Sequence, residues 1–423
     1  MADTSVPDGA AAKAEPQTPR GISWAYRVTS GVAIVGITAG TLSATVLTND
    51  YGGAQLGAIV TAVWIVFTVA GRLLVAPFLP LVIRKFGARR TFLVVKVAAA
   101  VLWVLLGVLL ALGVVGVLSL YATAPIFGAL GVFASTLTTL YSGAYISGHE
   151  MSGALTRMAV VRGGSIALGA LVGALIIVTL GPAWGIVARG LLEVPLVIVL
   201  LSYRPAEEPP APEAKRPVFA EMRKDLADNP VLRRLVVLGV GLTVFAGPFS
   251  ELLVPITSAL RQTGVVTGAA LLIASIALGQ VFSVQPVAAL QARFTAMQGS
   301  GLMGCLRAVC LGVYGLSAFL LSGGLELAVW AVIGLAFGMS RAASGALMVG
   351  AAVKTVPKEN SSRAIVAFSF ACTLSSPVGL LLWGALVSFV SVEVAILVGA
   401  VGAFAVSAYV FRRGDLRPSE QAA

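Results

Sequence analysis

Charged residues are scarce in this sequence, making up 11% of its 423 residues, while 58% are hydrophobic and the mean hydropathy is +0.96. A soluble domain carries roughly a quarter charged residues. Without a charged shell, a soluble protein of this length has no means of hiding so much apolar surface. The scarcity of charge therefore excludes an ordinary soluble protein and indicates that the surrounding solvent is lipid.

Histidine and cysteine are almost missing as well, with one histidine and three cysteines in the chain. Cys305, Cys310 and Cys372 all lie in apolar segments. On a helix, Cys305 and Cys310 point about 140° apart, which excludes a local disulfide or a CxxC redox pair. His149 has only Glu150 as a polar neighbour and is a poor candidate for a metal ligand. We expect neither a metal nor a cofactor.

Two kinds of catalytic motif are also missing. The sequence has no P-loop of the form G-x-x-x-x-G-K-[ST], which argues against a self-contained ATP-driven pump. It has no aspartate-rich loop, so a polytopic prenyl or glycosyl transferase is the weaker alternative. A non-transporting sensor or immunity protein is a third alternative, but no added soluble domain supports it. We expect a protein that is not an enzyme.

Long apolar segments dominate what is present. A helix that crosses a membrane needs about 20 mostly apolar residues, and the sequence predicts about twelve such helices. A hydrophilic linker at 204–232, rich in proline and acidic residues, separates the first six expected helices from the last six. Residues 113–116 are expected to form the turn between the third and the fourth helix. The expected helices are 28–49, 55–79, 91–112, 117–144, 163–180, 185–203, 233–256, 265–290, 300–321, 327–350, 364–388 and 391–411.

This pattern predicts an all-α integral membrane protein with twelve transmembrane helices in two six-helix bundles, 28–203 and 233–411. Residues 1–27 are expected to be a disordered cytoplasmic tail and 412–423 a second cytoplasmic tail. Cytoplasmic loops are enriched in Lys and Arg, and most of the 29 basic residues fall on that side in this orientation. The net charge of +11 thus reflects membrane topology and does not indicate nucleic acid.

The loop after the second expected helix carries a recognisable motif. It runs from Pro80 to Arg90 as PLVIRKFGARR. It resembles the major facilitator signature G-x-L-x-D-R-x-G-R-K, in which Pro80 replaces the first glycine and Arg84 the aspartate. The resemblance implies the major facilitator fold, with a gating loop that comprises Lys85, Gly87, Arg89 and Arg90.

Two further segments resemble the same superfamily. Residues 356–364 are similar to its loop before the eleventh helix, and 228–233 to the drug:proton antiporter branch that includes macrolide and siderophore exporters. This resemblance implies multidrug efflux or antibiotic resistance, with a drug or natural product exported by alternating access and proton antiport. The Gly-, Ala-, Val- and Arg-rich composition suggests a high-GC bacterium. We expect a multi-pass monomer in the bacterial cytoplasmic (inner) membrane that binds a small molecule and protons.

Acidic residues inside the spans are candidates for proton coupling, because ionisable groups are costly at that depth. Glu251 lies toward the outer end of the seventh expected helix, where the alternative is a carboxylate wetted by the periplasm. Glu193 lies in the sixth, four residues after Arg189. That spacing places both on one face of a helix, so a structural ion pair is the alternative.

Basic residues inside the spans outnumber these acids. Arg341 lies in the tenth helix among glycines, and Arg72 lies in the second, so both are candidates for a substrate cavity. Arg307 is expected to pair or to extend toward the cytoplasm, and Lys96 to extend toward the cytoplasm. The excess of positive charge favours anionic, zwitterionic or neutral polar substrates. An importer or uniporter of an organic anion, clamped by Arg341 and Arg72, is therefore the main alternative to export.

Hydroxyl side chains form stripes on two expected helices that face the cavity in the major facilitator fold. Such hydroxyls can equally bond to carbonyls of the preceding turn, so each is weak evidence alone. The cavity candidates on these stripes are Thr38, Thr41 and Thr45 on the first helix, and Ser135, Thr139 and Ser142 on the fourth.

Overall fold

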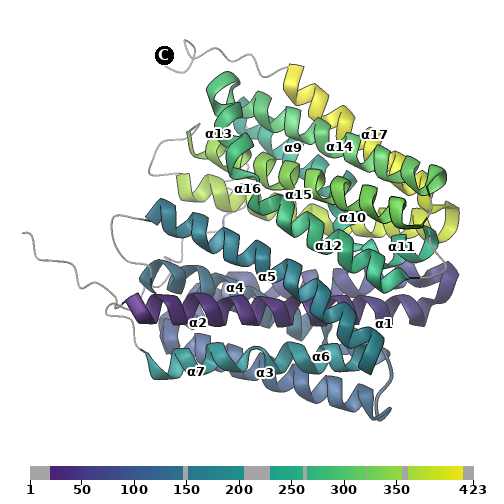
Figure 1. Cartoon of the computed structure of the whole chain (residues 1–423). Helices are drawn as coiled ribbons and strands as arrows, with labels where there is room; N and C mark the ends of the chain where they lie inside the picture. The colour runs from purple at the N-terminus through teal and green to yellow at the C-terminus, as the bar shows by residue number, and fades with distance from the viewer. Residues whose placement is uncertain are drawn as a thin grey trace, which may run out of the picture.

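The computed structural model describes residues 20–145, 151–203, 229–260, 264–321, 323–354 and 361–412, and all regular elements in these ranges are helical. Two groups of helices lie one above the other in Figure 1. The N-terminal half contains α1 (Arg20–Val75), α2 (Leu79–Phe86), α3 (Ala88–Ala111), α4 (Leu118–Tyr145), α5 (Met151–Leu180), α6 (Pro182–Leu191) and α7 (Val194–Ser202). The C-terminal half contains α9 (Pro230–Phe245), α10 (Gly247–Glu251), α11 (Leu253–Leu260), α12 (Val265–Val281), α13 (Val284–Arg293), α14 (Ala296–Leu320), α15 (Gly323–Lys354), α16 (Ser361–Ala385) and α17 (Val392–Arg412).

Ten helices in the described ranges are long and apolar enough to cross a membrane, or eleven if one bent pair counts as a span. This confirms a multi-pass, all-helical membrane protein, while the total of twelve stays a prediction. The seventh expected span accounts for part of the difference. It is divided into α9, α10 and α11, with breaks at Ala246 and Leu252. None of the three pieces is long enough to span alone.

Glycine marks two of the expected boundaries. Gly53 has φ 64° and separates the two spans that α1 joins, and Gly113 has φ 68° between α3 and α4. Glycine adopts positive φ without the steric cost that a Cβ atom brings. These two breaks were predictable from the sequence.

Two expected helices are interrupted. The sixth is divided into α6 and α7 by a turn at Leu192 and Glu193. Pro195 falls in the first turn of α7, where a backbone N–H has no acceptor within that helix, so the N–H that proline lacks costs little. The eighth is divided into α12 and α13, which bend by 52°.

Apolar cores differ between the halves. The C-terminal half has one large core that contains Phe249, Tyr314, Phe337 and Trp383. The N-terminal half has two smaller cores, one around Phe92 and one around Trp103. A further cluster joins the halves and consists mainly of alanines from α5 and α12 with Leu42, Val46 and Val254. Small residues allow these two helices to approach closely at the boundary between the halves.

Each half contains one helix crossing built on a pair of glycines. In the N-terminal half, a side chain at Gly71 of α1 would overlap the backbone of Pro125, and one at Gly128 of α4 the backbone of Thr68. We call this the first crossing. In both overlaps, the glycine of one helix faces the residue three positions before the glycine of the other.

The second crossing joins α12 and α15 in the C-terminal half. A side chain at Gly279 would overlap the backbone of Leu335, and one at Gly338 the backbone of Ile276. The register is the same as in the first crossing, with each glycine facing the residue three positions before its partner. The two halves therefore repeat one local design, and positions next to the glycines can be compared between them.

Candidate functional site

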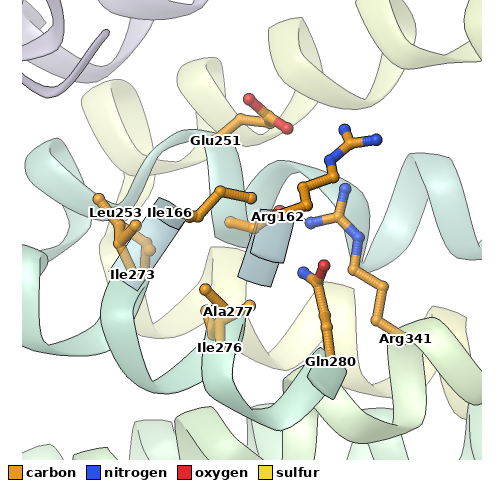
Figure 2. Close-up of a pocket in the computed structure, with 10 residues that line it drawn as sticks. Arg162, Ile166, Glu251, Leu253, Ile273, Ile276, Ala277, Gln280 and Arg341 are labelled. Carbon is orange, nitrogen blue, oxygen red and sulfur yellow. Dashed lines mark hydrogen bonds between the residues drawn. The ribbon is translucent and has the colours of Figure 1, made fainter. Parts of the chain in front are cut away.

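A cavity of about 240 Å³ lies between the two halves. Its polar lining comes from α5, α10, α12 and α15, and Figure 2 shows these side chains around a common space. The polar residues are Arg162, Ser250, Glu251, Gln280 and Arg341, and the apolar ones are Ile166, Leu253, Ile273, Ile276 and Ala277. Because Arg162 and Ile166 belong to one half and the others to its neighbour, a bound solute would contact both halves.

Arg341 is placed by the second crossing. It lies three residues after Gly338 on α15, and Gln280 directly follows Gly279 on α12, so the glycines bring both side chains to one wall of the cavity. Arg341 donates from Nη1 to Ser250 Oγ over 2.7 Å. Its hydrogen-bond partner is thus the hydroxyl of the residue before Glu251 and not the carboxylate of Glu251 itself.

Glu251 is the last residue of α10 and is exposed to the cavity. The break at Leu252 places it at a helix end, where its side chain is not covered by a following turn. Within the described ranges Glu251 forms no ion pair, although Figure 2 shows its carboxylate on the same side of the cavity as two guanidinium groups. A titratable group thus faces two cations without being held by them.

Arg162 was not singled out by the sequence. The expected fifth helix began at residue 163, so this arginine counted as one of the basic loop residues. In the structure α5 begins at Met151, eleven residues before Arg162, which places Arg162 about 16 Å along the helix. Residues 151–162 are partly polar, and extending the predicted helix through them would have identified Arg162 as a helical residue.

Arg72 and Arg189 lie in the N-terminal half. Arg72 directly follows Gly71 at the first crossing and is exposed, with its Nε 3.9 Å from the place of a Cβ on Gly131. Arg189 donates from Nη1 to Thr41 Oγ1 over 3.1 Å. Its guanidinium carbon lies 3.9 Å from the centroid of the Trp103 ring. The prediction that Arg72 faces the pathway remains a prediction.

The expected ion pair between Arg189 and Glu193 is not formed. Glu193 instead accepts from Lys96 Nζ over 2.8 Å, and both side chains are buried, at 6% and 4% exposure. The spacing argument fails because the turn between α6 and α7 ends the helix on which both residues were placed. This carboxylate holds Lys96 inside the half, where the lysine is buried.

Arg307 is buried too, in the C-terminal half. Its guanidinium carbon lies 4.9 Å from the centroid of the Phe337 ring, and 6% of the residue is exposed. Within the described residues no acid pairs with it, and the expectation that it reaches toward the cytoplasm stays a prediction. A cation over an aromatic face recovers part of the lost hydration.

The hydroxyl stripes are bonded mainly to their own helices. Thr38 donates to Ile34 O, and Thr45 donates to Thr41 O. Ser135 donates to Val132 O and is exposed. The side chains of Thr139 and Ser142 lie outside the part that the structure describes. Thr41 differs from Thr38 and Thr45 because its hydroxyl oxygen accepts from a charged group.

The gating-loop residues lie at the junction of two helices, with Lys85 in the last turn of α2, Gly87 between the helices, and Arg89 and Arg90 in the first turn of α3. Gly87 has φ 80° and ends α2, while Lys85 Nζ lies 5.5 Å from the centroid of the Phe86 ring and Arg90 is exposed. Arg89 donates to the carbonyl oxygens of Leu200 and Leu201 over 2.9 and 3.0 Å. This arginine caps the C-terminus of α7, so its contact stabilises the N-terminal half itself.

Two polar contacts between the halves lie close to the Gly53 break of α1, at one end of that helix pair. Asn49 Nδ2 donates to Ser258 Oγ over 3.4 Å, and the N–H of Ile59 donates to Ser388 Oγ over 3.1 Å. A side chain at Gly384 would approach Ala62 at 2.9 Å, so α16 packs closely on α1 there. We call this the closed end. The basic clusters predict that it faces away from the cytoplasm.

A bundle of apolar helices in two halves, with a charged cavity between them, is the architecture of a multi-pass membrane protein. Among the described residues, no group of three or more His, Cys, Asp or Glu gathers to hold a metal. The sequence matches no protein-family model and no curated protein sequence. The fold, however, matches solved structures over almost the whole chain.

The similar structures are all of transporters. The nucleoside transporter NupG superposes with a TM-score of 0.71 and 12% identity over 92% of this chain and 99% of that one. The peptide transporter POT superposes with a TM-score of 0.71 and 12% identity, over 95% of this chain and 96% of that one. A bacterial homologue of the iron transporter ferroportin, in an inward-facing state, has a TM-score of 0.69 and 12% identity, over 95% of this chain and 100% of that one. At this identity the likeness shows the fold, which is that of these membrane transporters.

Proposed function

We propose that this chain is a secondary transporter that moves a small organic anion by alternating access, with Glu251 as its proton-coupling group. The observation that carries the proposal is the cavity between the halves, where Arg162 and Arg341 come from opposite halves and share the space with one carboxylate. A carboxylate or other anionic group bound between these arginines would link the two halves electrostatically.

The cavity lining brings together like charges from the two halves. The guanidinium groups of Arg162 and Arg341 repel each other, and this repulsion opposes approach of the halves. A bound anion replaces the repulsion with two attractions and so favours closure around the solute. This is the differential interaction that a ligand needs in order to shift a conformational equilibrium.

Glu251 sets the expected direction of coupling. Its carboxylate and the anionic substrate compete for the same two arginines, because both are negative and both lie within the same cavity. Protonation of Glu251 removes the competitor and strengthens binding of the anion. Proton and anion would then move together in the same direction.

Export by proton antiport, the expectation from the sequence resemblance, is the second candidate. It is favoured by the exposure of Glu251, since a cationic group of a substrate could bind that carboxylate directly. In that case proton and substrate compete and move in opposite directions. The two candidates therefore differ in the sign of their response to a pH gradient.

The test uses the purified full chain in liposomes. The solutes are an aryl sulfonate, its neutral sulfonamide and an aryl trimethylammonium, and the gradient is imposed in either direction. A sulfonate and a quaternary ammonium stay ionised, so passive accumulation of a weak acid or a weak base does not interfere. Accumulation of the sulfonate in alkaline-interior liposomes supports the proposal, and accumulation of the quaternary ammonium in acidic-interior liposomes supports antiport.

The matched variant is Glu251→Gln, which keeps size and polarity. We expect it to lose accumulation driven by the pH gradient while exchange of labelled for unlabelled solute continues. Full gradient-driven accumulation by this variant would contradict the coupling role. Absence of movement of all three solutes by correctly inserted protein would contradict the transport proposal for these chemical classes.

A further inference from the structure

The N-terminal half holds a second group of cationic side chains, separate from the residues that line the cavity of Figure 2. Arg189 is its centre. The stem of this side chain crosses α1 at Gly40, where a Cβ would meet it at 2.5 Å. The guanidinium stacks on Trp103 and donates to Thr41, and its Nε is buried without a hydrogen-bond partner in the described structure. The side chain is thus fixed in position while part of its donor capacity is unused.

Arg72 adds a second positive charge. It is near enough to Arg189 for the two charges to oppose each other, and it is exposed. Neither guanidinium forms an ion pair within the described ranges. The acid closest in sequence to Arg189 is Glu193, and Lys96 already holds that carboxylate at 2.8 Å. Glu193 therefore attracts Arg189 without forming an ion pair with it, and neither Arg189 nor Arg72 is in contact with an acid within the described ranges.

The two glycine crossings relate this group to the cavity. Arg72 follows Gly71 at the first crossing, as Gln280 follows Gly279 at the second. Gly131 lies three residues after Gly128, as Arg341 lies three residues after Gly338. Each crossing therefore presents one arginine, on α1 in the first and on α15 in the second. The positions facing them are Gly131 and Gln280.

We infer that Arg189, Arg72 and Thr41 form a second anion subsite, which binds the carboxylate or phosphate group of an organic molecule. The inference rests on the proposed function, because the subsite would serve the substrate of the same pathway. Stacking on Trp103 and the bond to Thr41 preorganise the guanidinium, which reduces the entropy lost on binding. Arg72, which is exposed, would supply the second positive charge.

Thiol labelling tests the subsite without requiring transport. Thr41 is exposed and contacts Arg189, so Thr41→Cys places a reporter at the site. The background replaces Cys305, Cys310 and Cys372 by serine or alanine. Rates are measured with an anionic sulfonatoethyl and a cationic trimethylammonioethyl methanethiosulfonate, and their ratio reports the local potential.

We expect the anionic reagent to react faster, with a preference that falls about tenfold or more when Arg189→Gln is added. Inorganic phosphate should slow the anionic reagent more than potassium chloride does at equal ionic strength. The matched control is Ser250→Cys, beside Arg341, whose reagent preference should not respond to Arg189→Gln. Arg72→Gln is the second variant, for the case in which Arg189→Gln fails to fold.

The outcomes separate this inference from the proposed function. Labelling that follows the expectation supports the subsite even if no solute moves in liposomes. Conversely, transport that needs Arg162 and Arg341 stands even if the subsite fails. The inference is overturned if the reagent preference survives the arginine substitutions, or if phosphate leaves labelling of Thr41→Cys unchanged.

Discussion

The two halves solve the same problem, a buried basic residue, in different ways. In the N-terminal half, Lys96 is neutralised by Glu193 at 2.8 Å. In the C-terminal half, Arg307 lies over the Phe337 ring with no acid paired to it in the described structure. Removal of the acid should therefore lower the stability of the N-terminal half, and the C-terminal half has no equivalent acid to remove within the described residues. The comparison teaches that two cations of similar burial can depend on quite different partners.

The largest expected effect is on the ion pair of the N-terminal half. Glu193→Ala leaves the Lys96 ammonium buried without a partner, and we expect a loss of about 3–5 kcal/mol of stability. Thermal unfolding of the purified protein measures it. The double variant Lys96→Met/Glu193→Leu is the control and should recover most of the loss, since apolar groups of similar volume replace both charges. A loss below about 1 kcal/mol in Glu193→Ala would contradict a stabilising pair.

Arg341→Gln comes next and concerns transport. Hydrogen bonds to charged groups contribute about 1.5–3 kcal/mol, so we expect uptake of the sulfonate to fall about 10- to 100-fold. Arg341→Lys is the conservative control and should retain part of the activity because the charge remains. Initial rates in liposomes give the comparison. An equal fall for the neutral sulfonamide would indicate a packing defect and not the loss of an anion contact.

Gly40→Ala probes how Arg189 crosses α1. The added Cβ would meet the arginine stem at 2.5 Å, so a shift of α6 or of the side chain is required. We expect a loss of about 1–3 kcal/mol in thermal or denaturant unfolding. Gly345 on α15 is the matched control, because no atom lies within 4 Å of its Cβ position. Gly345→Ala should be neutral or stabilising by up to about 1 kcal/mol.

Ser388→Ala has the smallest expected effect and acts on the closed end. It removes the hydroxyl that accepts from the N–H of Ile59, a contact with a net value of about 1 kcal/mol. The population with this end open should rise by roughly fivefold, as measured by distances between spin labels on the two halves. Unchanged distance distributions would show that apolar packing alone holds the closed end.

The sequence predicts where helices exist better than where they begin or which residues meet. Apolar segments and the glycines at 53 and 113 predict the main breaks, because hydropathy and positive φ are local properties. Arg162 was missed because the start of α5 lies in a partly polar stretch. The predicted pairing of Glu193 with Arg189 was wrong because Lys96 reaches Glu193 from another helix. Contacts between helices depend on packing that no local pattern encodes.

The glycine crossings also restrict how the molecule can deform. Where two helices are in contact through their backbones, no flexible side chains lie between them that could rearrange when the helices slide. Each crossed pair therefore moves as one rigid unit. Bending must then fall on segments whose hydrogen-bond ladder is already interrupted. The α9–α10–α11 segment, broken at Ala246 and Leu252, has this property and carries Glu251 at its second break. The carboxylate of Glu251, at this break, would change its surroundings whenever the rigid helix pairs tilt relative to each other.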